Sequence, residues 1–344
     1  MFKSSALLAS FASVVTGAPV APATKVAPGT CPSLYGPGDH TVELRIVDPG
    51  TGFAWLRSFE LFVPDSMPLS EERPTLVNWH GCGSDPGRFE SESLINDRVG
   101  RYNYYSIYPR GSSRAVSPVD DQTLCQFGDF TCGWNSNANP GGCQTPTGPA
   151  PDDVNFANVV LDWMSDNLCV DMDRVFITGF SNGGQMAYRL NCELSQRLAG
   201  VATNGMGASA AQTPGGGTCS PQRAIPAVNY CGSTDFVNCY GDASASTLLA
   251  QVNAFAAFNG CTGEPTRSEL SSTSFCFDAT GCPGSLPVRG CGIVGLGHCW
   301  PNFPGAGNAE CQNQDPANVD ASLNLLDFFD SLPAGSTWDK EGSN

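Results

Sequence analysis

The stretch Gly179-Phe180-Ser181-Asn182-Gly183-Gly184, GFSNGG, follows the pattern G-x-S-x-G. This pattern is typical of a sharp turn between a strand and a helix, in which a serine hydroxyl is lifted clear of the sheet and glycine stands where a side chain would clash. The chain contains 39 glycines, so the pattern can also arise by chance. The alternative is that Ser181 is only a small residue in a glycine-rich turn, and the surrounding sequence must decide.

The residues on both sides of this stretch have the required pattern. Arg174 to Gly179, RVFITG, is rich in β-branched residues and predicts a strand that leads directly into Ser181. Asn182 to Leu194 predicts a helix. Strand, turn and helix therefore follow one another as the motif requires.

Strands and helices are predicted to alternate along the rest of the chain. The further predicted strands are Thr41 to Val47, Phe59 to Val63, Pro74 to His80, Tyr104 to Pro109, Leu198 to Thr203, Ala227 to Tyr230 and Val288 to Val294. The further predicted helices are Arg88 to Val99, Val154 to Leu168, Ser246 to Phe258 and Val319 to Phe329. After an antiparallel start with one solvated face, this alternation predicts an α/β fold: a mainly parallel sheet with helices on both faces.

Composition divides the chain into four parts. Residues 1–18 contain one Lys and an apolar run and are typical of a secretory signal peptide, and 19–30 form a Pro/Ala-rich leader. Residues 31–335 are predicted to form a single domain, followed by a polar tail over 336–344. No later run approaches the roughly 20 apolar residues of a membrane helix. We therefore expect a secreted protein without a membrane partner.

All 16 cysteines lie at or beyond Cys31, and their number is even. In a secreted chain this predicts disulfides, although their connectivity does not follow from the sequence. Three close pairs are hypothesised to staple loops: Cys231/Cys239, Cys276/Cys282 and Cys291/Cys299. The alternative is a zinc site, but no C-x-x-C occurs and the chain has three histidines, so no metal is expected.

The formal charge of −16 comes from 33 acidic and 17 basic residues. Such a chain repels nucleic acid, anionic lipid and polyanionic substrates, and it contains no Lys/Arg cluster of the kind that binds nucleic acid. The simpler interpretation of the charge is solubility. Nucleic acid is therefore not an expected partner.

A base for the serine hydroxyl must be found among three histidines, His40, His80 and His298. A serine is a weak nucleophile until a base takes its proton and a third group orients that base. If the order along the chain is nucleophile, acid, base, only His298 follows Ser181. It lies in GLGHCWP, a glycine-rich loop after a predicted strand. The alternative is a loop histidine on the surface.

The acid is predicted to be Asp235. It follows the strand AVNY in CGSTDFVNC, and functional groups of open α/β sheets lie at the carboxyl ends of strands. Asp242 in the same loop is the alternative. Glu193, at the end of the helix after Ser181, is expected to be a solvated charge.

Two backbone N–H groups are predicted to face the oxyanion of an acyl transition state. One belongs to Asn182, at a helix N-terminus, and the other to the loop after the third strand, His80-Gly81-Cys82-Gly83, in which Cys82 is a candidate donor. The Cys82 sulfur is expected to be in a disulfide, the alternative being a free nucleophilic thiol. His80 is expected to order this loop.

These residues resemble a family of secreted α/β-hydrolases that includes polyhydroxybutyrate depolymerases and feruloyl esterases. The matching motifs are spread from about Arg73 to Phe329: LVNWHGC, PDDVNF, DRVFITGFSNGGQMAYRLNCEL, GSTD, FNGC and GLGHCWP. The resemblance implies an α/β-hydrolase fold, a triad of Ser181, Asp235 and His298, oxyanion donors at Cys82 and Asn182, and no cofactor. It also places Trp300 beside the site, although this residue alone could equally belong to the core.

Two features depart from the family pattern. Asp235 is followed by FVNCYG in place of a Val-Pro-Tyr type segment, and the stretch from Cys125 to Cys143 is an additional cysteine-containing insertion. Such differences affect the rim of the site, which selects the acyl and alcohol groups.

The function expected from these observations is a secreted serine carboxylic-ester hydrolase that works through an acyl-enzyme. Its expected substrates are feruloyl or related plant-wall esters, either free or linked to a polymer. The alternatives are a polyhydroxybutyrate depolymerase, an acetylxylan esterase, an acyl transferase, and a catalytically inactive binding module. The oligomeric state does not follow from the sequence.

Overall fold

The computed structural model describes residues 31, 33–49, 52, 54–113, 128, 132–136, 151–206, 219–235, 246–284, 286–302, 311, 315 and 317–333. The predicted signal peptide, leader and polar tail, most of the Cys125 to Cys143 insertion, Cys239 and Asp242 lie outside the described residues. The boundaries of the single domain stay a prediction.

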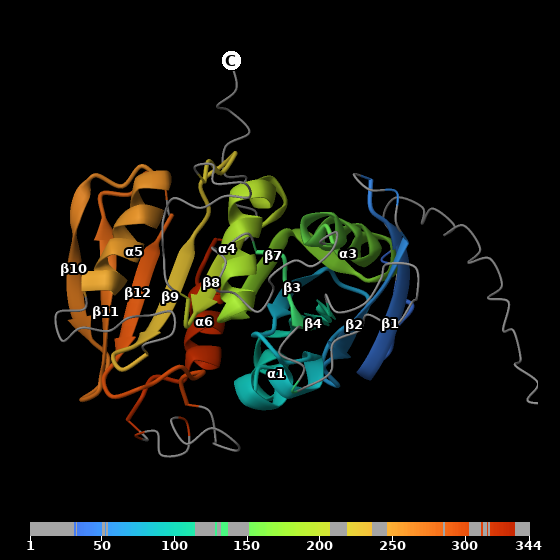
Figure 1. The fold of residues 1–344 in the computed structure, drawn as a ribbon, viewed down its shortest axis with the longest axis horizontal. Helices are drawn as coiled ribbons and strands as arrows, with labels where there is room; N and C mark the ends of the chain where they lie inside the picture. Colours follow the sequence, from blue (N-terminus) through green and yellow to red (C-terminus); the bar gives the residue numbers. More distant parts are fainter. Residues whose placement is uncertain are drawn as a thin grey trace, which may run out of the picture.

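A ten-stranded sheet with the order β1-β2-β4-β3-β7-β8-β9-β12-β11-β10 forms the centre of the molecule (Figure 1). Its strands are β1 (Gly38–Val47), β2 (Ala54–Val63), β3 (Arg73–Trp79), β4 (Tyr105–Pro109), β7 (Val170–Phe180), β8 (Gly200–Asn204), β9 (Ala227–Gly232), β10 (Gly263–Glu269), β11 (Ser274–Thr280) and β12 (Val288–Ile293). From β4 to β12 the neighbours are parallel, and antiparallel pairs flank them on both sides. A separate short pair joins β5 (Ser112–Ser113) to β6 (Cys132–Gly133).

Helices cover both faces of the sheet (Figure 1). They are α1 (Pro86–Ser93), α2 (Asn96–Tyr102), α3 (Asp153–Asn167), α4 (Asn182–Leu194), α5 (Ser246–Phe258) and α6 (Ala321–Asp330). Successive residues of β3 illustrate why the central strands are apolar throughout. Val77 packs in one core with residues of α3, α4 and α5, whereas Leu76 packs in the other with residues of α1, α2 and α6. The predicted mainly parallel sheet with helices on both faces is therefore confirmed.

The structure differs from the prediction at two elements. The predicted helix from Arg88 to Val99 is two helices, because Leu94 ends α1 with a left-handed backbone at φ 54°. The hairpin of β10 and β11 was not predicted, because β10 lies at the sheet edge with mostly exposed residues and lacks an apolar alternation.

The described disulfides join cysteines that are between 12 and 138 residues apart in the sequence. The pairs with both members described are Cys31–Cys169, Cys192–Cys219, Cys261–Cys282, Cys276–Cys291 and Cys299–Cys311. The hypothesised pairs Cys276/Cys282 and Cys291/Cys299 are therefore wrong. Cys276 and Cys291 lie directly opposite each other on β11 and β12, with Cα atoms 4.0 Å apart, so strand register decides the pairing. The pair Cys231/Cys239 is not tested, because Cys239 lies outside the described residues.

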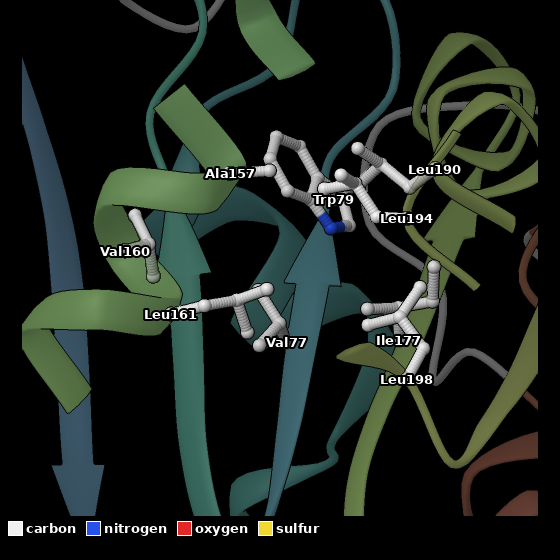
Figure 2. Close-up of a pocket in the computed structure, with 9 residues that line it drawn as sticks. All are labelled: Val77, Trp79, Ala157, Val160, Leu161, Ile177, Leu190, Leu194 and Leu198. Carbon is white, nitrogen blue, oxygen red and sulfur yellow. The ribbon is translucent and has the colours of Figure 1, made fainter. Parts of the chain in front are cut away.

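A small apolar cavity lies between β3, β7, α3 and α4 (Figure 2). It is lined by Val77, Trp79, Ala157, Val160, Leu161, Ile177, Leu190, Leu194 and Leu198. The Trp79 indole nitrogen is the one side-chain polar atom among these residues. None of the predicted site residues reaches this cavity, so the predicted chemistry belongs elsewhere in the fold.

Candidate active site

Ser181 stands at the turn between β7 and α4, as predicted. Its backbone has φ 54° and ψ −120°, a conformation that a residue with a side chain rarely adopts. The Ser181 N–H donates to the Asn204 carbonyl at the end of β8, over 2.9 Å. Strain of this kind costs about 1–3 kcal/mol and persists only where the surrounding structure enforces it. The surrounding structure therefore holds this turn in one conformation, so it is not a loose glycine-rich loop.

The two glycines of the motif are required by close backbone approaches. A Cβ atom on Gly179 would lie 2.2 Å from the Gly183 carbonyl oxygen, and one on Gly183 would lie 2.0 Å from the Trp79 carbonyl oxygen. In both cases the obstacle is backbone, which cannot give way as a side chain can. The pattern G-x-S-x-G thus records how tightly the turn fits against the end of β3.

We expect Gly183→Ala to lower the free energy of unfolding by more than about 4 kcal/mol, or to prevent folding, because α4 must move away from β3 to admit the methyl group. Gly100→Ala in α2 is the matched control, since its Cβ would make only ordinary contacts, the nearest at 3.7 Å. Urea unfolding of both variants measures the difference. Equal stability of the two variants would contradict the account of the turn.

His298 and Asp235 meet at the carboxyl ends of β12 and β9. The His298 Nδ1 lies 2.8 Å from Asp235 Oδ2, and the Asp235 side chain is 1% exposed. A Cβ on Gly232 would lie 2.2 Å from the Leu296 carbonyl oxygen, so the loop that carries His298 lies directly on the end of β9. The Thr234 N–H also donates to Leu296 over 2.9 Å. This contact brings the predicted base and acid together.

The His298 ring also lies against the turn at Ser181. Its centroid is 4.8 Å from that of Phe180, the residue before Ser181. At Gly205, after β8, an added Cβ would come within 2.7 Å of the Phe180 ring and 3.3 Å of His298 Cε1, so glycine leaves room for both rings. The three residues predicted as a triad therefore gather at one edge of the sheet, on segments that follow β7, β9 and β12.

Two other candidates for base and acid, His40 and Glu193, form contacts away from Ser181. His40 is in β1, where its Nε2 lies 2.7 Å from the Gly36 carbonyl oxygen. Glu193 forms an ion pair with Arg189 over 2.7 Å, one helical turn away. Asp242 is not described. Among the described carboxylates, Asp235 is the one whose oxygen contacts the His298 ring.

The loop after β3 packs under the turn. A Cβ on Gly81 would lie 3.5 Å from the Ser181 Cβ, and the next residue, Cys82, is disulfide-bonded, as expected. Asn182 is the first residue of α4, where the N–H groups have no acceptor within the helix and the helix dipole is positive. The two predicted oxyanion donors thus belong to segments that flank Ser181.

His80 holds the peptide group that contains the Cys82 N–H. Its Nε2 accepts from the Gly111 N–H at 2.9 Å, so the proton must be on Nδ1, which donates to the Gly81 carbonyl at 2.8 Å. That carbonyl and the Cys82 N–H share one peptide plane and point in opposite directions. The imidazole therefore fixes the direction of the N–H, in agreement with the expectation that His80 orders this loop.

Burial lowers the pKa of the His80 imidazole from 6.5 to about 4. Between these values the unfolded chain binds a proton that the folded protein does not. The free energy of unfolding is therefore expected to fall by about 3 kcal/mol as the pH is lowered from 6.5 to 4. His80→Gln, which keeps an acceptor for Gly111 but does not titrate, should lose this part of the pH dependence in urea unfolding. Identical pH profiles for the two proteins would contradict the assignment.

Trp300 lies inside the core. It is 3% exposed, its indole N–H donates to Ser322 Oγ over 2.9 Å, and its ring packs edge-on against Phe89 at 5.3 Å. This position favours the core alternative that the sequence left open.

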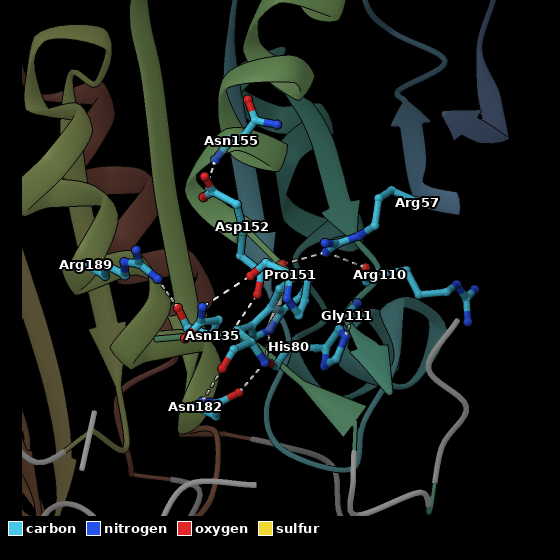
Figure 3. Close-up of polar contacts among 12 residues, drawn as sticks. Arg57, His80, Arg110, Gly111, Asn135, Pro151, Asp152, Asn155, Asn182 and Arg189 are labelled. Carbon is cyan, nitrogen blue, oxygen red and sulfur yellow. Dashed lines mark hydrogen bonds and ion pairs between the residues drawn. The ribbon is translucent and has the colours of Figure 1, made fainter. Parts of the chain in front are cut away.

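Sequence reasoning missed a buried polar network beside the site (Figure 3). Asp152 caps α3, accepting from the Asn155 N–H at 2.9 Å, and Asp153 forms a fully buried ion pair with Arg57 at 2.8 Å. The motif PDDVNF was the available signal, but the partner Arg57 is on β2, far away in sequence.

Comparisons with known proteins identify the family and the fold of this chain. The model of the phospholipase/carboxylesterase family matches residues 66–262, more than half of the chain. The chain belongs to the phospholipase/carboxylesterase family. The predicted α/β-hydrolase fold is thereby confirmed. The acetyl xylan esterase from Aspergillus awamori has a similar fold, with a TM-score of 0.52 over 76% of this chain and 94% of that one, at 13% identity.

The curated relatives of this chain include feruloyl esterases. Feruloyl esterase B of Piromyces equi is 28% identical over 246 residues, which are 68% of this chain and 41% of the relative. Feruloyl esterase D of Neurospora crassa is 30% identical over 146 residues, which are 42% of this chain and 44% of the relative. The chain thus spans less than half the length of these relatives. Their names agree with the predicted resemblance of this carboxylesterase-family member to feruloyl esterases.

The described residues contain no group of three or more His, Cys, Asp or Glu side chains placed to hold a metal ion. Nor does any helix in the described ranges combine the length and the apolar character needed to cross a membrane.

Proposed function

We propose that the protein is a serine hydrolase of carboxylic esters that works through an acyl-enzyme. The observation that carries this proposal is the 2.8 Å contact between His298 Nδ1 and Asp235, made beside the strained turn at Ser181. Membership of the phospholipase/carboxylesterase family supports it.

The roles follow from which atoms are engaged. Because Nδ1 of His298 is bonded to Asp235, the other ring nitrogen, Nε2, is the one that exchanges protons with the reactants. Ser181 Oγ attacks the ester carbonyl while His298 takes its proton, and Asp235 stabilises the resulting imidazolium. His298 then gives the proton to the departing alcohol. In the second half, it activates a water that releases the acid from Ser181.

The negative oxygen of each tetrahedral intermediate would be stabilised by the N–H groups of Cys82 and Asn182. Each belongs to a segment next to Ser181, and each is held from behind: Cys82 through the His80 bond to Gly81, and Asn182 by its position in the first turn of α4. Fixed donors of this kind stabilise a developing charge more than water does, because they need no reorientation during the reaction.

The substrates we propose are feruloyl esters and related esters of plant cell walls. The two feruloyl esterase relatives support this class, and the disulfides support an extracellular location. Acetylxylan and polyhydroxybutyrate are the alternative substrates. Transfer of the acyl group to a second alcohol is the alternative reaction.

The test compares initial rates on methyl ferulate, acetylated xylan and amorphous polyhydroxybutyrate, with and without added glycerol. The proposal expects the highest kcat/KM on methyl ferulate, with ferulic acid as the main product. A higher rate on acetylated xylan or on polyhydroxybutyrate would assign that polymer as the substrate in place of feruloyl esters. A glycerol ester as the main product would replace hydrolysis by transfer, and no turnover of any ester would favour the binding-module alternative.

A further inference from the structure

The segment Cys132–Ser136 lies between the two structures that carry the proposed oxyanion donors. On one side it contacts the beginning of α4 through the Asn182 side chain. The Asn182 Oδ1 accepts from the Trp134 N–H at 2.7 Å, and its Nδ2 donates to the Trp134 carbonyl at 3.3 Å and to Ser136 Oγ at 3.1 Å. Asn182 as a residue is 4% exposed. Its carboxamide thus pairs with the main chain of Trp134 as a neighbouring strand would.

On the other side, the same segment holds the loop after β3. The Trp134 indole Nε1 donates to the His80 carbonyl over 2.8 Å, and the Cys132 carbonyl accepts from the Gly83 N–H over 3.1 Å. These two bonds bracket Gly81 and Cys82, because they lie immediately before and after them. The His80 ring also lies 4.8 Å from the Trp134 ring.

Buried groups anchor the segment from behind (Figure 3). Asp153 Oδ2 accepts from the Asn135 N–H over 2.6 Å, while its other oxygen is held by Arg57. Arg189 of α4 donates to the Asn135 carbonyl. The Arg57 guanidinium in turn lies 3.9 Å above the Phe156 ring. The main-chain groups of Trp134 and Asn135 are thus bonded to buried side chains, so the segment has little freedom to shift.

We propose that Trp134 is a positioning residue that sets the distance between the Cys82 and Asn182 N–H groups, with the Asn182 carboxamide as its partner on α4. This inference rests on the proposed function. Trp134 does not touch the substrate. It acts by holding the His80 carbonyl on one side and the first residue of α4 on the other, so that both donors face the same point beside Ser181.

Trp79 provides a matched control for this inference. Trp79 and Trp134 are each 1% exposed and contact each other edge-on with ring centroids 4.6 Å apart. The Trp134 indole Nε1 donates to the His80 carbonyl, whereas the Trp79 indole Nε1 has no hydrogen-bond partner among the described residues. Replacing either residue by Phe removes a similar buried volume, but only Trp134→Phe removes a bond to the loop of the oxyanion donor.

The experiment measures kcat and KM for p-nitrophenyl butyrate, together with the Tm, for the wild type, Trp134→Phe and Trp79→Phe. We expect Trp134→Phe to lower kcat about tenfold or more with little change in KM, because misplaced donors weaken the interaction with the transition state and not with the substrate. Trp79→Phe should lower the Tm but keep kcat within about twofold. Equal kcat values for the two variants would overturn the inference.

A second pair of variants covers the case in which Trp134→Phe does not fold. Asn182→Ala keeps the backbone N–H but removes both bonds to Trp134, whereas Gln185→Ala, one turn further along α4, removes only a contact with Ser136 and Asn182. A larger fall in kcat for Asn182→Ala is expected, and equal values would overturn the inference. Ser181→Ala distinguishes a failure of this inference from a failure of the proposed function. If Ser181→Ala retains full activity, the proposed function itself is wrong.

Discussion

Replacing Ser181 by alanine is expected to lower kcat/KM for p-nitrophenyl butyrate by about 10⁴- to 10⁶-fold, because no acyl-enzyme can form without the hydroxyl. The residual rate should come from substrate binding and the oxyanion donors alone. Ser181 is 7% exposed and its backbone is held by the bond to Asn204, so the missing oxygen is a small structural change. Steady-state kinetics of the purified variant, with its disulfides intact, give the comparison.

A stability measurement makes this prediction specific. The Ser181→Ala variant should unfold at nearly the same urea concentration as the wild type, so the loss cannot be ascribed to unfolding. An activity within tenfold of the wild type would contradict the role of Ser181 and favour the alternative that the serine is merely a turn residue.

Replacing Asp235 by asparagine is expected to lower kcat by about 10⁴-fold. An asparagine amide at this place can donate to Nδ1 and thereby move the proton of His298 to Nε2, the atom that must accept the proton of Ser181. The present 2.8 Å contact fixes the opposite tautomer. Asp278, which pairs with Arg289 over 2.6 Å on β11 and β12, provides a control carboxylate outside the site. Asp278→Asn should keep kcat within about twofold.

An unchanged kcat in Asp235→Asn would assign the role of acid to another group, and Asp242 would then be the first to test.

The turn and its partners were predictable because their signals are local. A β-branched run ending in G-x-S-x-G requires only residues within one strand and one helix, and the clashes at Gly179 and Gly183 explain why both positions are glycine. His298 and Asp235 were predictable because each follows a recognisable strand, and the carboxyl ends of parallel strands meet at one edge. The contact between them confirms that they lie together, whereas their chemical roles stay proposals.

The features that were not predicted have no recognisable local pattern in the sequence. The pairing of Cys276 with Cys291 follows from the register of β11 on β12, and not from the spacing of cysteines in the sequence. The break at Leu94 has no glycine or proline to announce it. The contacts of Trp134 are made largely with backbone atoms of His80 and with one carboxamide, so no pattern of residue types points to them.

The most direct test of the central claim is to identify the residue that becomes covalently modified. The purified protein would be incubated with diethyl p-nitrophenyl phosphate, which transfers its diethylphosphoryl group to activated serines, and its peptides would be analysed by mass spectrometry. We predict one diethylphosphoryl group per chain, on Ser181, with complete loss of esterase activity. Inactivation with the label on another residue, or full activity after labelling of Ser181, would contradict it.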